Sequence, residues 1–132
     1  MGETVATRVR RLLAESGGIA SCHYIAEQIG MRPRAVRDRL KRAGDRIVSL
    51  GAGYFALKSA PFAPLVDFAE YWVQRHGPQP IVILTDTILD HYPRGHRDAV
   101  RRWLQQEPGR LQRRPGTDLI ERTPQRWKDR TP

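Results

Sequence analysis

Residues 34–47 read RAVRDRLKRAGDRI, and residues 98–111 read DAVRRWLQQEPGRL. When the chain is shifted by 64 positions, Ala, Val, Arg, Leu and Arg fall in register between the two stretches. Similarity at a fixed spacing is the sequence signature of a repeated structural unit. Each stretch also has apolar residues at helical spacing among basic ones, which predicts a basic amphipathic helix. We therefore expect one small unit to occur twice in this chain.

Two shorter helices are predicted before the first basic helix. An apolar stripe with i, i+4, i+7, i+8 spacing predicts an amphipathic helix that Gly17-Gly18 ends. The members of this stripe are Val5, Val9, Leu12 and Leu13. Ser21 is then placed to N-cap a second helix in the sequence CHYIAEQIG. Pro33 suits the first position of the basic helix, and Gly44 suits the residue just past its end.

The second copy has the same order of elements. Its first helix has an equivalent apolar stripe and ends at His76-Gly77-Pro78. The stripe consists of Leu65, Phe68, Ala69, Trp72 and Val73. Thr85 is the expected N-cap of a short helix in DTILDHY, with Ile88 and Tyr92 facing inward.

A β-hairpin is expected after each basic helix. The sequence RIVSLGAGYFALK contains two β-prone runs joined by Gly51-Ala52-Gly53, and RLQRRPGTDLIER is a poorer version with Pro115-Gly116 as its turn. The Pro-rich stretch SAPFAP at 59–64 marks the boundary between units at 1–60 and 61–132. This connection is short, so we expect the two units to pack against each other. The predicted fold class is mainly α with small β-hairpins.

Net charge indicates the chemistry of the partner. The chain has 23 Lys plus Arg against 14 Asp plus Glu, a formal charge of +9, which favours a polyanion such as nucleic acid. Residues 1–60 carry 11 basic and 5 acidic side chains, whereas residues 61–132 carry 12 and 9. The first unit is therefore the better candidate for binding.

The stretch CHYIAEQIGMRPRAVRDRLKR followed by DRIVSLGAGYFAL resembles the winged helix-turn-helix superfamily of bacterial DNA-binding proteins. In that pattern a second helix, a turn, a basic third helix and a Gly-tipped wing follow in this order. The resemblance covers about residues 4–58, and a weaker version over about 64–123 implies a tandem winged-helix protein. It implies duplex DNA as the partner, with the third helix in the major groove and the wing on the backbone.

Three cationic residues of the first basic helix are expected to carry recognition. At about 100° per residue, Val36, Leu40 and Ala43 form the buried face, and Arg34, Arg37 and Lys41 form one exposed stripe. Such a stripe suits a helix that contacts base edges and phosphates. Further candidates for contact with DNA lie around it and in the second unit. They are Arg32 at the cap position, Arg39, Arg46, Lys58, Arg97 and Arg101.

The second unit is expected to contribute less. Its outward positions Arg97, Asp98, Arg101 and Gln105 form a mixed stripe, and Trp103 is expected to pack at the interface between units. Its wing is polar and interrupted by Pro. We expect phosphate anchoring or protein docking here, together with a basic tail that contains Arg126, Lys128 and Arg130.

Enzyme, cofactor and metal functions are not expected. The chain has no GxxxxGK[ST], GxSxG or HExxH motif. Cys22 and His23 point about 100° apart on one helix, and no second cysteine is available to complete a zinc site. Cys22 is expected to be a small packing residue, and His23 a surface or capping side chain.

The leading hypothesis is a bacterial transcription regulator that is cytoplasmic and associated with the nucleoid. No apolar run approaches the roughly 18 residues of a membrane span, and the N-terminus lacks the apolar core of a signal peptide. The partners considered are duplex DNA, RNA polymerase or another protein, and a second copy in a homodimer. Two alternatives remain: RNA binding, and a protein-interaction module using an apolar patch around Trp72, Trp103 and Trp127.

Overall fold

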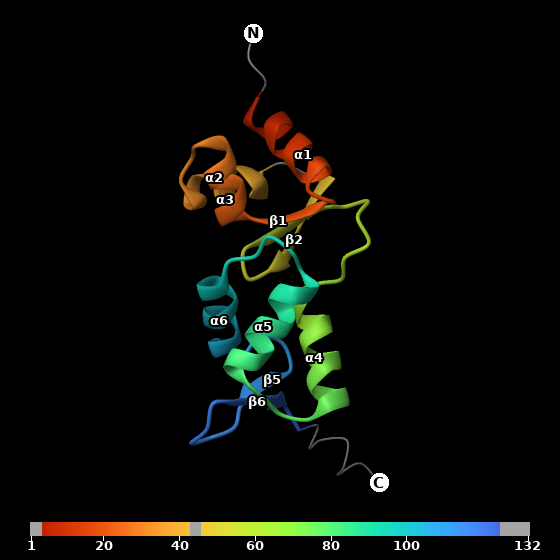
Figure 1. Cartoon of the computed structure of the whole chain (residues 1–132), viewed down its shortest axis with the longest axis vertical. Coiled ribbons are helices and arrows are strands. Elements are labelled where there is room, and N and C mark those ends of the chain that lie inside the picture. Colours follow the sequence, from red (N-terminus) through yellow and green to blue (C-terminus); the bar gives the residue numbers. More distant parts are fainter. Residues whose placement is uncertain (1–3, 43–45, 125–132) are drawn as a thin grey trace.

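The computed structural model describes residues 4–42 and 46–124. In this part of the chain, six helices and two three-stranded antiparallel sheets follow the order α-β-α-α-β-β twice (Figure 1). The fold is thus mixed α/β, with more sheet than the expected pair of hairpins. No helix in these ranges is long and apolar enough to cross a membrane.

The first unit has the expected helices and hairpin. Thr4 caps the first helix, and the Ser21 hydroxyl accepts a hydrogen bond from the Tyr24 N–H at 3.1 Å, which confirms the predicted cap of the second. Ala43, Gly44 and the tail beyond Pro124 lie outside the described residues. The elements are α1 (Val5–Glu15), β1 (Ile19–Ser21), α2 (Cys22–Ile29), α3 (Pro33–Lys41), β2 (Ile47–Gly51) and β3 (Tyr54–Leu57).

The second unit repeats this order. Its elements are α4 (Leu65–His76), β4 (Gln79–Pro80), α5 (Ile81–His91), α6 (Arg97–Gln105), β5 (Leu111–Arg113) and β6 (Leu119–Arg122). The predicted cap at Thr85 is wrong, because α5 begins four residues earlier at Ile81. Thr85 lies inside the helix, where its hydroxyl donates to the Ile81 carbonyl at 2.7 Å. Burial of Ile81 and Leu84 draws the preceding apolar run into the helix, since packing outweighs a local capping preference.

The third strand of each sheet was not predicted. In the first unit β1 pairs with β3, so that Ile19 faces Ala56 across the ladder, and in the second β4 pairs with β6, with Gln79 opposite Ile120. These strands are two or three residues long, too short for an alternating pattern to be visible in the sequence. They give both units the same strand order, with the third strand of the unit in the middle of its sheet.

The larger hydrophobic core extends across both units. Ile19, Leu50, Tyr54 and Ala56 of the first sheet belong to one buried cluster with residues of α4, α5, α6 and the second sheet. A smaller cluster lies between α1, α2, α3 and the first hairpin. Figure 1 shows the first sheet in the middle of the molecule, with α1, α2 and α3 at one end and the second unit at the other. The two units are therefore packed together, as the short connection predicts.

Candidate nucleic-acid interface

Helix α3 presents its charged residues as the sequence predicts. Val36 and Leu40 are buried, while Arg34, Arg37 and Lys41 are exposed. Pro33 occupies the first turn, and no side chain caps the helix at Arg32. The flanking candidate Arg39 and its neighbour Arg42 are exposed as well.

A cleft of about 620 Å³ separates α3 from α6 of the second unit. We call it the inter-unit cleft. Arg34 and Arg37 line it, so two residues of the predicted stripe face the second unit across this cleft. Lys41 is not among the lining residues. The full lining is Cys22, His23, Arg32, Pro33, Arg34, Arg37, Ala52, Gly53, Ala99, Arg102, Trp103 and Gln106. None of these is acidic.

The second unit contributes Arg102 to the cleft, which the sequence did not single out. The candidates that it did single out are engaged elsewhere: Arg97 pairs with Asp86, and Arg101 lies 3.4 Å from Asp98. The repeat aligns Arg101 with Arg37 and Arg102 with Asp38, so the sequence favours Arg101 as the contact residue. The packing of α6 beside α3 is what places Arg102 in the inter-unit cleft.

The tip of the first hairpin faces the second unit. The Cys22 N–H donates to the Gly53 carbonyl at 2.8 Å, and Ala52 and Gly53 line the inter-unit cleft. A Cβ at Gly51 would lie 3.4 Å from Nε1 of Trp103. Trp103 therefore packs at the interface between units, as predicted. A phosphate that enters the cleft can therefore meet Ala52 and Gly53 of the tip.

Two histidines meet beside the cleft. The rings of His23 and His96 stack with centroids 3.8 Å apart and an interplanar angle of 14°. His96 also caps α6, because its Nδ1 accepts a hydrogen bond from the Ala99 N–H at 3.3 Å. His23 was expected at the surface or at a cap, and it is partly exposed, with its ring against that of His96.

Burial favours the neutral forms of His23 and Cys22 beside the cleft. Burial lowers the pKa of His23, and nearby His96, Arg37 and Arg102 lower it further. Burial also raises the pKa of the Cys22 thiol, which is the packing residue that the sequence predicts. The described residues contain no group of three or more His, Cys, Asp or Glu side chains that could hold a metal ion.

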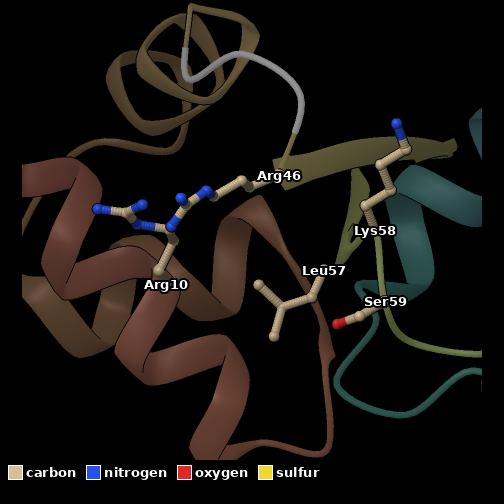
Figure 2. A pocket seen from close by; sticks show the side chains of 5 residues that line it. All are labelled: Arg10, Arg46, Leu57, Lys58 and Ser59. Carbon is tan, nitrogen blue, oxygen red and sulfur yellow. The ribbon is translucent and has the colours of Figure 1, made fainter.

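A second basic hollow, of about 550 Å³, lies at the base of the first hairpin (Figure 2). Arg46 and Lys58, both predicted phosphate contacts, line it together with Leu57 and Ser59. Arg10 from α1 completes it, and the sequence did not single out this residue. Apart from its positive charge, nothing in the sequence around Arg10 indicates a binding residue. We call this hollow the basic pocket.

Comparison with known proteins gives no relative from which a function could be transferred. No protein-family model, no curated protein and no solved structure matches this chain.

Proposed function

We propose that this protein binds duplex DNA through the inter-unit cleft and the exposed face of α3, and that it acts as a transcription regulator built from two winged-helix units. The observation that carries the proposal is the gathering of four arginines around one cleft: Arg32, Arg34 and Arg37 from the first unit and Arg102 from the second. Guanidinium groups suit phosphate oxygens and guanine edges, and no acidic side chain lines the cleft to neutralise them.

The architecture supports the winged-helix part of the proposal. Each unit has three helices and a three-stranded sheet in the order α-β-α-α-β-β. The last two strands form a hairpin, which corresponds to the wing in the winged-helix resemblance. In this proposal the sugar-phosphate backbone enters the cleft between α3 and α6. Arg34 and Arg37 then bind phosphates or reach base edges from one side, and Arg102 binds phosphate from the other.

The positions of the tryptophans favour DNA over the alternative of a protein-docking module. A protein-docking module would present one exposed apolar patch that contains the three tryptophans. Trp103 instead packs against the first hairpin, and Trp72 is half-buried against Phe68 and His76. Trp127 lies outside the described residues. The arginine cleft is the stronger feature, and RNA remains the alternative polyanion.

The test has two parts. The first is the salt dependence of binding to a duplex, for which we expect a log–log slope steeper than about −4, since about five phosphates are neutralised at roughly 0.9 each. A flat dependence would remove the nucleic-acid proposal. The second is selection from a random duplex library at about 150 mM salt, with structured RNA as competitor. Enrichment of one duplex motif supports a sequence-specific regulator, whereas displacement by RNA at equal concentration favours the alternative.

A further inference from the structure

The basic pocket is built by three elements that are far apart in the sequence. Arg10 comes from the middle of α1, Arg46 immediately precedes β2, and Lys58 and Ser59 follow β3. Figure 2 shows the side chains of Arg10 and Arg46 extending toward one another, with Lys58 and Ser59 on the other side of Leu57. Like charges that converge in this way repel each other unless an anion lies between them.

Hydrogen bonds hold the backbone around the pocket in place. The Lys58 N–H donates to the Arg46 carbonyl at 2.8 Å, and the Leu57 N–H donates to the Gly18 carbonyl at 2.9 Å. The Arg10 side chain contacts the preceding turn of α1, because its Nη2 lies 3.4 Å from the Thr7 hydroxyl oxygen. The backbone from which Arg46 and Lys58 extend into the pocket is thus fixed by hydrogen bonds.

The pocket cations have no acidic partner within the described residues. The ion pairs there join Arg97 to Asp86, Arg101 to Asp98 and Arg114 to Glu121, and none of them includes a residue of the pocket. The guanidiniums of Arg10 and Arg46 offer several donors to a single anion, whereas Figure 2 shows Lys58 and Ser59 at the other side of Leu57. The two guanidiniums match a phosphoryl group, which has several acceptor oxygens and up to two charges, better than a carboxylate.

We propose that the basic pocket binds a phosphoryl group, with the half-buried Leu57 in contact with the sugar or other apolar part next to it. The phosphoryl group can belong to a phosphodiester of the nucleic acid in the inter-unit cleft or to a free phosphomonoester. If the pocket binds a phosphodiester, the inference rests on the proposed function. If it binds a free phosphomonoester, the inference does not depend on DNA binding.

The geometry of the hairpin favours the phosphodiester. The hairpin tip lines the inter-unit cleft, and its base carries the basic pocket. The five residues of β2 between them span about 16 Å at 3.3 Å per residue. Phosphates of one DNA strand are spaced about 3.4 Å along the axis, so this length matches about five nucleotides. A DNA strand that followed the hairpin from the cleft would cover this length before it met the basic pocket.

The experiment compares the full chain with Arg10→Gln and Lys58→Gln, two substitutions at opposite sides of the pocket. Arg75→Gln on α4 is the matched control, since Arg75 is exposed and lines neither the pocket nor the cleft. The probes are a 20-base-pair duplex of random sequence, titrated at several salt concentrations, and adenosine monophosphate, titrated by calorimetry. Circular dichroism checks that each variant is folded.

We expect each pocket substitution to weaken the duplex complex whatever its sequence and to reduce the magnitude of the salt slope by about 0.9, while Arg75→Gln leaves the slope unchanged. If the full chain binds adenosine monophosphate but no duplex, and Arg10→Gln removes that binding, the pocket is a phosphomonoester site and the proposed function fails. If the pocket variants match the full chain with both probes, the inference is overturned. A loss in Arg75→Gln equal to that in Arg10→Gln also overturns it, since net charge alone would then explain the effect.

Discussion

The hydroxyl of Tyr54 donates a hydrogen bond to the backbone carbonyl of Tyr92, joining the first sheet to the end of α5. Both side chains are buried, and burial raises the pKa of Tyr54, so its hydroxyl keeps the proton that it donates. Tyr92 in turn donates its own hydroxyl to the Ala63 carbonyl at 2.9 Å, in the connection between units. These two hydrogen bonds join the first sheet, the end of α5 and the connection between the units.

Removal of the Tyr54 hydroxyl is expected to destabilise the whole chain. In Tyr54→Phe the buried Tyr92 carbonyl loses its hydrogen-bond donor, which costs about 1–3 kcal/mol in the free energy of unfolding. Urea denaturation measures this loss. Tyr71→Phe is the matched control, because Tyr71 is 54% exposed and its change should have no effect. Equal stability of Tyr54→Phe and the unchanged chain would show that this contact does not hold the units together.

Gly95 lies against the same hydroxyl. A Cβ at this position would collide with Oη and Cζ of Tyr54 and with Cδ2 of Leu89. We therefore expect Gly95→Ala to lower the free energy of unfolding by about 1–3 kcal/mol, a typical loss for overpacking. Part of the collision involves the hydroxyl, so the double variant with Tyr54→Phe should lose less than the sum of the two single losses. Strict additivity in denaturation experiments would contradict this contact.

Stability is expected to fall in mild acid because of His23. Burial and the nearby cations lower the pKa of His23 in the folded chain below its ordinary value of about 6.5, which applies when the chain is unfolded. The unfolded chain therefore takes up a proton that the folded chain resists. The stabilisation is complete above about pH 6.5 and is lost as the pH falls through the window down to the folded pKa. Denaturation at pH 7.5 and 5.5 should show a smaller loss for His23→Gln than for the unchanged chain. The same loss in both would assign the effect to other groups.

Much of the fold could be predicted from local patterns. The stripe Val5, Val9, Leu12 and Leu13 predicts α1, Ser21 predicts the start of α2, and Gly51-Ala52-Gly53 predicts the hairpin. These features depend on neighbours close in the sequence, so periodicity and turn chemistry are sufficient to find them. Strands β1 and β4 are different, because they exist only through pairing with residues about 35–40 positions later.

The candidate site was less predictable, since it depends on how the units meet. The exposure of Arg34 and Arg37 can be predicted from the helical periodicity of α3. The residues of α6 that line the other side of the cleft cannot be predicted in this way. The repeat favours Arg101, which aligns with Arg37, but the packing of α6 places Arg102 at the cleft instead. Arg10 joins the basic pocket for the same reason, because α1 packs over the hairpin. Contacts between distant segments leave no periodic signal in either case.

Substitutions at Arg37 and Arg46 are expected to differ in kind. Arg37 is in the cleft on the proposed reading helix, so Arg37→Ala should weaken a specific duplex by about 1–3 kcal/mol and relax the preference at one base position. Arg46 lies in the basic pocket, so Arg46→Ala should weaken all sequences alike. Binding of each variant to the selected site and to its point variants measures both effects. Equal and sequence-independent losses would show that α3 holds the backbone and does not read bases.

The neighbouring pair Arg101 and Arg102 tests whether the second unit takes part in binding. Arg102 lines the inter-unit cleft, whereas Arg101 lies beside Asp98 on another face of the same helix turn. The two substitutions Arg102→Gln and Arg101→Gln remove the same charge at adjacent positions. If the cleft holds a phosphate between α3 and α6, Arg102→Gln should reduce the magnitude of the salt slope by about 0.9, and Arg101→Gln should change it much less. Long-range electrostatics would affect both variants equally, because their charges lie within one Debye length of each other. Equal effects would therefore contradict a phosphate contact specific to Arg102, whereas a selective loss in Arg102→Gln would make the site a composite of both units.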